Sequence, residues 1–364
     1  MQFIIDLVVT IVTIYLSFTN NLADKIIELV PSESEKEIVD ETVPLSESSL
    51  PSLPSIFETK TFPDILLRST DYQKASAVDS ITPNITTTDP LAALVNIFCT
   101  FTSSTTIRTT TGTGFFVHSS GVILTNAHVA QYLLLEETDA LGEAECIVRQ
   151  GTPAEPKFRA ELLYIPPTWV QNNAAMISES SPTGTGERDY ALLYVTESLN
   201  NDPLPKIFPA LALNTELLPR SIKGNGVMAV GYPATAILKH GASTPLLSVL
   251  ATTTISELYT FGSNYADVFS IKGSAVGDVG SSGGPIIDEN NKVIGVIVTR
   301  GDDENDGEGS LRAITLSHIN RTILEETGFS LEQNTSGNLS YRANIFTNTL
   351  APFLISLLSK ELII

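Results

Sequence analysis

The chain has 364 residues and a formal net charge of −20 at pH 7, with 41 acidic side chains against 21 basic ones. This length accommodates one large domain or two ordinary ones. The acidic balance argues against a nucleic-acid-binding protein and against docking on anionic lipid by charge, because both need a basic surface.

The first 27 residues contain a largely apolar stretch over 3–18, which Asp6 interrupts. The stretch is shorter than the ~20 residues that cross a bilayer comfortably. No Lys or Arg precedes it, so it lacks the positive start of an ordinary signal peptide. We predict a membrane-targeting segment over 1–27, either an uncleaved anchor or a signal peptide. The alternative is an amphipathic helix that packs on the protein.

Residues 28–90 combine many acidic side chains with Ser and Pro. Such a composition buries too little apolar surface to offset the entropy of ordering the chain. We therefore predict a flexible, disordered acidic linker. Short apolar pieces of it, such as 65–67, could dock locally.

From Leu91 the sequence changes to short β-rich runs separated by Gly, Ser, Thr and Pro. Alternating short strands of this kind favour a closed antiparallel barrel over an open sheet. The first barrel is expected within 91–200, with strands over 94–102, 110–119, 121–126, 145–149, 159–165 and from Asp189 onward. A short helix is expected over 129–137 and a long loop over 166–188, with Trp169 as a loop anchor.

Two stretches of this first half have the residue types of an acid–base pair. The motif Thr-Asn-Ala-His128-Val ends a predicted hairpin, and Asp189 opens an apolar strand. A charged residue there is costly unless it is paired, and an imidazole N–H would be a suitable partner. By contrast, His118 is expected to be exposed at a hairpin tip, and Arg188 to be a solvated loop charge.

The second half repeats the β-rich pattern, and a second barrel is expected within 201–328. Its predicted strands cover 227–233, 246–255, 268–272, 292–299 and 311–314, and 286–287 is a further short apolar run. Ser317 is expected to cap a helix over 319–327 that stops at Gly328. In the tail, 329–364, the apolar stretch over 345–364 could form a membrane-surface helix, a packing helix or an oligomer contact.

The stretch Gly280-Ser281-Ser282-Gly283-Gly284-Pro285 is the most specific feature of the second half. Three glycines in six residues are costly unless the backbone needs positive φ or close approach. A serine in such a turn can stand exposed beside main-chain N–H groups, as acyl transfer requires. The alternative is an ordinary glycine-rich hairpin turn.

The acidic loop over 301–308 partly imitates a calcium-binding loop. Its twelfth position from Asp302 is Ala313, where a calcium loop needs a bidentate Glu. We therefore predict a solvated hairpin, and we expect neither a metal nor a cofactor.

Three motifs in this order, Thr-Asn-Ala-His128-Val, Asp189-Tyr-Ala-Leu-Leu and Gly-Ser-Ser282-Gly-Gly-Pro, resemble the trypsin-like (chymotrypsin-fold) serine proteases. The likeness is closest to the bacterial high-temperature-requirement type and covers roughly 91–327. It implies an all-β fold of two six-stranded antiparallel barrels followed by a C-terminal helix. The tail is too short for the PDZ module that many such proteases carry, so PDZ-controlled regulation is not expected.

The resemblance also implies catalytic roles. Ser282 would be the nucleophile, His128 the base and Asp189 the acid that orients it. The N–H groups of Gly280 and Ser282, with Ser281 as a further candidate, would form the oxyanion hole. Ser281 stands where animal trypsins have an aspartate that pairs with a newly cut amino terminus, so activation by such a cut is not expected.

Substrate-binding residues follow from the same likeness. The floor of the primary pocket would be Val276, with Ala275 beside it, which favours small or medium apolar side chains. Val298, Thr299 and Arg300 would pair with the substrate as an extended strand.

The chain has two cysteines, Cys99 and Cys146. The resemblance implies that their strands are neighbours, so the two could form a disulfide; the alternative is two separate buried thiols. A disulfide requires an oxidising compartment. We accordingly expect an extracytoplasmic protein, membrane-anchored or secreted.

Together these features predict a serine endopeptidase that works through an acyl-enzyme on polypeptide substrates. The alternative is a catalytically silent trypsin-like barrel that binds peptides or scaffolds an assembly. An esterase using the same triad is disfavoured by the Gly-Gly-Pro context and by the order of the three residues. The sequence does not predict the oligomeric state.

Overall fold

A computed structural model gives the architecture of most of the chain. The residues it describes are 50–53, 65–76, 84–103, 107–138, 142–179, 184–200, 202–240, 244–262 and 264–362. The predicted membrane-targeting segment, 1–27, and most of the predicted linker, 28–90, lie outside these residues. Within the described ranges, no helix has the length and apolar character needed to span a bilayer.

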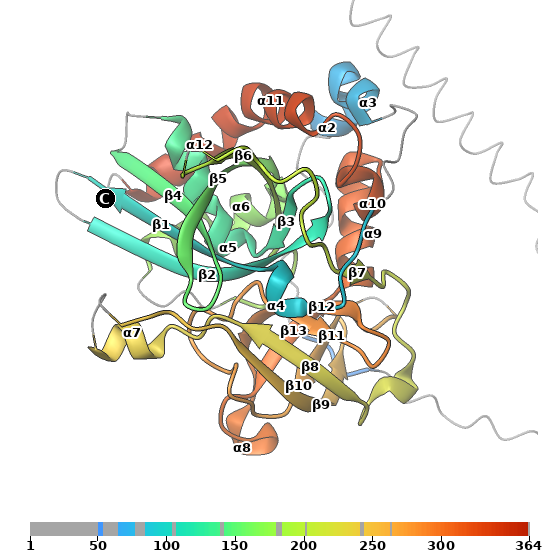
Figure 1. Cartoon of the computed structure of the whole chain (residues 1–364). Coiled ribbons are helices and arrows are strands. Elements are labelled where there is room, and N and C mark those ends of the chain that lie inside the picture. Colours follow the sequence, from blue (N-terminus) through green and yellow to red (C-terminus); the bar gives the residue numbers. More distant parts are fainter. Residues whose placement is uncertain are drawn as a thin grey trace, which may run out of the picture. The chain divides into compact units, whose positions relative to one another are not determined.

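The first half of the described chain folds into a closed barrel in which the strands follow the order β1-β2-β3-β6-β5-β4 (Figure 1). Every neighbouring pair is antiparallel. The strands are β1 Leu94–Thr102, β2 Ile107–His118, β3 Val122–Thr125, β4 Glu143–Gln150, β5 Glu155–Tyr164 and β6 Ala191–Ser198. Alternating apolar side chains such as Val95 and Ile97 fill its core.

The first and fourth strands of this barrel are also joined covalently. Cys99 of β1 lies directly opposite Cys146 of β4 in the strand register. The two residues form the expected disulfide, and both side chains are buried.

The second half forms another closed barrel, with the order β11-β8-β9-β10-β13-β12 and a final pairing of β11 with β12. Its strands are β8 Gly226–Gly231, β9 Val249–Tyr259, β10 Val268–Ile271, β11 Pro285–Ile287, β12 Lys292–Arg300 and β13 Leu311–Thr315. The prediction of two six-stranded antiparallel barrels is therefore confirmed. The short strand β7, Ala212–Leu213, was not predicted, and it pairs with β12 in parallel.

Short helical elements connect these strands. They are α4 Pro90–Ala93, α5 Ala127–Ala130, η1 Gln131–Glu137, α6 Pro167–Asn173, η2 Ala174–Ser178, η3 Arg220–Ile222, α7 Thr235–His240 and α8 Asp303–Asp306. The loop predicted over 166–188 thus contains α6 and η2, and Trp169 of α6 is buried. The expectation that His118 is exposed is wrong, because its side chain is buried and its Nδ1 accepts the Ser120 N–H.

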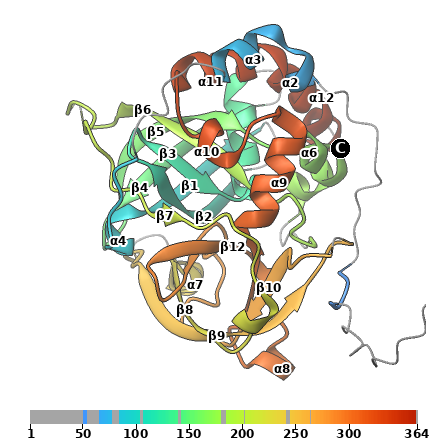
Figure 2. The ribbon, with the colours of Figure 1, turned by 90° about the vertical axis from the view of Figure 1, so that its right-hand side faces the viewer.

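Helix α9, Leu316–Thr327, follows the second barrel and lies beside β12 (Figure 2). It contacts both β12 and β13. Its N-cap is Thr315, whose hydroxyl accepts the His318 N–H, rather than the predicted Ser317. The helix ends at Gly328, which has a φ of 81°.

Three further helices follow: α10 Leu331–Asn334, α11 Leu339–Thr349 and α12 Ala351–Leu362. Helix α11 packs on β5 and β6, and α12 packs on α6, η1 and η2 of the first barrel (Figure 1). The apolar side of α12 is occupied in this way, since Leu354 and Leu358 are fully buried. Of the alternatives for the tail, the structure therefore contains the packing helix.

Part of the predicted linker is helical and packed. Helices α2, Ile65–Arg68, and α3, Thr70–Ser76, lie beside α9 and α11 respectively. Leu66 is buried, and Tyr72 is fully buried with its hydroxyl donating to Asn334 Oδ1 at 3.0 Å. For these residues the expectation of an extended, disordered chain does not hold, because an aromatic side chain anchors them on the C-terminal helices.

Candidate active site

The pairing of β3 with β6 brings His128 and Asp189 together. Thr125 ends β3 opposite Ala191, which begins β6, so the residues beyond each of them emerge at the same edge. The His128 main-chain N–H donates to Asp189 Oδ1 at 2.9 Å, and His128 Nδ1 lies 2.7 Å from Asp189 Oδ2. Because an ionised carboxylate only accepts, Nδ1 carries a proton and Nε2 remains the basic nitrogen of the neutral ring.

Burial and charge act on His128 in opposite directions. Burial lowers the pKa of His128, while the charge of Asp189 and its hydrogen bond raise that pKa by more. The net result is a pKa above the ordinary value of 6.5. The His128 side chain keeps 17% of its surface exposed and that of Asp189 keeps 8%. The carboxylate is thus placed to stabilise an imidazolium ring that solvent can still reach.

Arg188, immediately before Asp189, is not the solvated loop charge that was predicted. Its guanidinium donates to Glu326 Oε1 at 2.6 Å and to Glu325 Oε2 at 2.7 Å, both in the last turn of α9. The Arg188 side chain is 15% exposed and that of Glu326 is 13% exposed, whereas Glu325 is 66% exposed. Its backbone has a φ of 57°, which is uncommon for a residue with a side chain.

The same helix also holds the residue after Asp189. The Tyr190 hydroxyl lies 2.9 Å from the Thr322 hydroxyl of α9. Glu326 further accepts the hydroxyl of Tyr164 at 2.6 Å and that of Thr168. Burial raises the pKa of Glu326, although Arg188 lowers it. Sequence reasoning missed this network, because its partners are more than a hundred residues apart and form no local motif.

The turn around Ser282 requires its glycines. Gly280 has a φ of 95° and Gly283 a φ of 89°. A side-chain carbon added to Gly283 would lie 1.9 Å from the carbonyl oxygen of Thr113, and one added to Gly280 would lie 2.6 Å from the Tyr232 carbonyl oxygen. Backbone of neighbouring segments therefore occupies the space that side chains would need.

The orientation of two N–H groups in this turn follows from the carbonyls beside them. The Val279 carbonyl accepts the Ala234 N–H at 2.7 Å, and the Ser281 carbonyl accepts the Gly284 N–H at 2.9 Å. In a planar trans peptide the N–H points opposite to the C=O. The N–H groups of Gly280 and Ser282 consequently point away from these donors, and neither donates to another described residue.

Ser281 does not supply a further N–H donor as predicted. Its N–H donates to the Asp278 carbonyl at 3.2 Å, so it is already occupied. Its side chain is fully buried, and among the described residues its hydroxyl has no hydrogen-bond partner. The candidate oxyanion site thus consists of the N–H groups of Gly280 and Ser282.

The Ser282 turn is attached to the first barrel next to the strand that leads to His128. The Ser282 carbonyl accepts the Thr113 N–H of β2 at 2.7 Å, and the Thr125 hydroxyl at the end of β3 donates to the Thr113 carbonyl at 2.7 Å. Ser282 is half-buried, and within the described part of the chain it makes no hydrogen bond to His128. Catalytic hydrogen bonds are often long before substrate binds.

The predicted substrate-binding residues lie in different environments. Val276 is fully buried in the core of the second barrel, so it does not form the floor of an open pocket in this structure. Ala275 is exposed. Along the last three residues of β12, Val298 is buried, Thr299 is half-buried and Arg300 is exposed.

The acidic loop after β12 uses its carboxylates internally. Asp302 accepts the Glu304 N–H and caps α8, while Asp303 accepts both the N–H and the hydroxyl of Ser310. No group of three His, Cys, Asp or Glu side chains among the described residues is placed to hold a metal ion.

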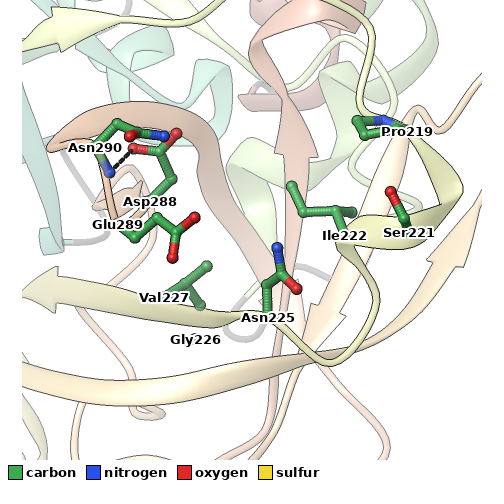
Figure 3. Close-up of a pocket in the computed structure, with 9 residues that line it drawn as sticks. All are labelled: Pro219, Ser221, Ile222, Asn225, Gly226, Val227, Asp288, Glu289 and Asn290. Carbon is green, nitrogen blue, oxygen red and sulfur yellow. Dashed lines mark hydrogen bonds between the residues drawn. The ribbon is translucent and has the colours of Figure 1, made fainter.

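A cavity of about 140 Å³ opens elsewhere on the second barrel (Figure 3). It lies between the turn that precedes β8 and the hairpin that joins β11 to β12. Its lining includes Ile222, Asn225, Val227 and Glu289. None of the predicted catalytic or substrate-binding residues lines it, so it is separate from the candidate active site.

The sequence of the chain matches a known protein family. The model of the trypsin-like peptidase domain matches residues 112–296. The uncharacterized protein y4bJ of Sinorhizobium fredii (strain NBRC 101917 / NGR234) is 26% identical over 189 residues, which are 52% of this chain and 22% of that protein. The chain thus matches less than a quarter of the length of that relative.

Two solved structures are similar to this chain at low sequence identity. The active form of the Rv3671c protease from M. tuberculosis is 19% identical with a TM-score of 0.41, covering 82% of this chain and 96% of that one. Deg5 is 19% identical with a TM-score of 0.41, covering 64% of this chain and 89% of that one. Because the family model spans half of the sequence, the chain belongs to the trypsin-like peptidase family.

Proposed function

We propose that this peptidase is a serine endopeptidase that cleaves polypeptides through an acyl-enzyme. The observation that carries the proposal is the hydrogen-bonded His128–Asp189 pair, with Nδ1 and Oδ2 2.7 Å apart. The same domain holds Ser282 in a turn whose neighbouring N–H donors are unoccupied by described residues. A base, an orienting acid, a hydroxyl and oxyanion donors are the groups that acyl transfer needs.

In the proposed reaction, the Ser282 hydroxyl attacks the scissile carbonyl carbon while His128 Nε2 accepts its proton. The N–H groups of Gly280 and Ser282 bind the oxygen that becomes negative. Asp189 keeps the proton of Nδ1 in place and stabilises the imidazolium ring. His128 then gives the proton to the leaving amine, and water removes the acyl group by the same sequence of steps.

We further propose that substrate binds as an extended strand along Val298, Thr299 and Arg300, with a small or medium apolar side chain at the cleaved bond. This preference follows from the family resemblance, which places the apolar Ala275 beside that side chain. Cleavage of a peptide library tests this specificity, and a dominant preference for Lys or Arg would contradict it.

The competing function is a catalytically silent barrel that binds peptides or scaffolds an assembly. Hydrolysis of an unstructured protein such as casein separates the two functions. We expect cleavage by the native chain and none by Ser282→Ala, with both variants giving the same circular dichroism spectrum. Undiminished cleavage by Ser282→Ala would remove Ser282 from the mechanism.

We also propose an extracytoplasmic location, supported by the disulfide between Cys99 and Cys146. Fractionation of cells that produce the tagged chain tests this location, and a purely cytoplasmic pool would contradict it. Membrane attachment through 1–27 concerns residues outside the described ranges and stays a prediction.

A further inference from the structure

Thr113 occupies the junction between the two barrels. It lies in β2 of the first barrel and is fully buried. Its hydroxyl donates to the Gly280 carbonyl at 2.7 Å and accepts the Tyr232 N–H at 2.9 Å. Its main-chain N–H donates to the Ser282 carbonyl at 2.7 Å. One residue of the first barrel thus binds the Ser282 turn at two points, Gly280 and Ser282.

These two points are the residues whose N–H groups form the candidate oxyanion site. The Gly280 carbonyl belongs to the peptide plane that links Gly280 to Ser281, so its hydrogen bond to Thr113 limits the rotation of that plane. The Ser282 carbonyl is limited in the same way on the other side of the turn. The N–H groups of Gly280 and Ser282 lie in the neighbouring peptide planes, which join the held planes at the Cα atoms of these two residues. Contacts from the opposite barrel therefore help to fix both donors, in addition to the bonds of the Val279 and Ser281 carbonyls within the second barrel.

The hydroxyl of Thr113, more than the volume of its side chain, fixes the position of the Ser282 turn. A hydroxyl group has one donor and two acceptor positions, and here the donor is used on Gly280. A valine of similar shape would leave the Gly280 carbonyl and the Tyr232 N–H without this partner in a buried place. Unpaired buried groups are costly, so the turn would rotate to regain a partner. Such a rotation displaces the oxyanion donors.

We infer that Thr113 is a positioning residue of the active site, which holds the oxyanion donors of Gly280 and Ser282 in place from the first barrel. The inference rests on the proposed function. Thr113 itself does not contact the reacting atoms, so its effect falls on transition-state binding and leaves ground-state binding largely intact.

The test compares Thr113→Val with Thr113→Ser. For each variant, kcat and KM are measured on a peptide ester, together with the inhibition constant of a peptide trifluoromethyl ketone, which forms an oxyanion on Ser282. For Thr113→Val we expect kcat/KM and affinity for the ketone to fall together by about 10- to 100-fold, with KM changed by less than about threefold. Thr113→Ser keeps the hydroxyl, and we expect both quantities to stay near those of the native chain.

A matched control removes a buried threonine hydroxyl elsewhere. Thr327 of α9 is fully buried, and its hydroxyl donates to the Ile323 carbonyl at 2.6 Å. Thr327→Val should lower the melting temperature without changing kcat/KM or the affinity for the ketone. If Thr113→Val does not fold, Thr113→Cys replaces it, because a thiol is a weak donor; it should bind the ketone more weakly than Thr113→Ser does.

The outcomes separate the inference from the function on which it rests. If the native chain neither hydrolyses the ester nor binds the ketone, the proposed function fails. If the native chain is active and Thr113→Val, or Thr113→Cys in its place, binds the ketone as tightly as Thr113→Ser, the positioning role of Thr113 is wrong.

Discussion

The two barrels hold their candidate catalytic groups by different means. In the first barrel, His128 and Asp189 are held largely by side-chain contacts, and the residues around Asp189 are bound to α9 through Arg188 and Tyr190. In the second barrel, the Ser282 turn is held mainly by carbonyl and N–H groups, two of which bind Thr113 of the first barrel. The acid–base pair is therefore sensitive to side-chain substitutions, and the Ser282 turn is sensitive to changes in backbone geometry.

Among changes that keep Ser282 in place, the largest expected effect is that of Asp189→Asn. The amide cannot hold the same imidazole tautomer, so His128 Nε2 would no longer be free to accept the Ser282 proton. We expect kcat to fall by about 10³- to 10⁴-fold. The substitution also removes the negative charge beside His128, and the profile of kcat/KM against pH measures the effect of that loss.

The direction of that change follows from the raised pKa of His128. A protonated His128 cannot accept the Ser282 proton, so activity of the native chain should be lost as the pH falls through a pKa above 6.5. Without the Asp189 charge, only burial shifts the pKa of His128, and the loss of activity should move to lower pH. An unchanged acidic limit in Asp189→Asn would contradict this account.

The His128–Asp189 pair also contributes stability that is fully present below pH 6.5 and lost as pH rises through the raised pKa.

The next effect concerns the backbone of the Ser282 turn. Gly283→Ala adds a carbon that meets the Thr113 carbonyl at 1.9 Å, at a φ of 89°. We expect the free energy of unfolding to fall by about 3 kcal/mol or more, from strain and overpacking together.

Gly224→Ala is the matched control for that substitution. Gly224 has the same φ of 89°, and no atom lies within 4 Å of the added carbon. Its cost should be strain alone, about 1 kcal/mol. Urea denaturation measures the free energy of unfolding of both variants. Equal losses would show that the contact of the added carbon with the Thr113 carbonyl does not contribute to the cost of Gly283→Ala.

The third prediction compares the contributions to stability of the two glutamates that bind Arg188. Glu326→Gln weakens a buried ion pair, for which we expect a loss of about 3 kcal/mol in stability. Glu325→Gln removes an exposed partner and should cost less than about 1 kcal/mol. Thermal unfolding checks the difference, and equal costs would contradict the assignment of Glu326 as the buried anchor.

Much of the fold could be predicted from the sequence, because strand patterns are local. In the stretches that form β1, β6 and β12, apolar residues alternate with polar ones or follow one another, and both patterns predict strands directly. The glycines around Ser282 likewise predicted a turn under steric constraint. Of the site, the contact of His128 with Asp189 could be expected in advance, both from the cost of an unpaired charge at the start of an apolar strand and from the family resemblance.

What could not be predicted depends on contacts between distant segments. Arg188 resembled any loop arginine until α9 placed two glutamates beside it. Val276 seemed a pocket residue, yet the packing of the second barrel buries it. Thr113 carried no local signal, since its partners Gly280 and Tyr232 belong to the other barrel.

Reaction with a fluorophosphonate probe tests the central claim most directly. The probe forms a covalent bond only with a serine that a working base activates and whose oxyanion site is formed. We expect stoichiometric labelling of the folded chain, located at Ser282 by peptide mass mapping and absent in Ser282→Ala and in denatured protein. A folded chain that stays unlabelled at Ser282, or that is labelled at another serine, would contradict the account.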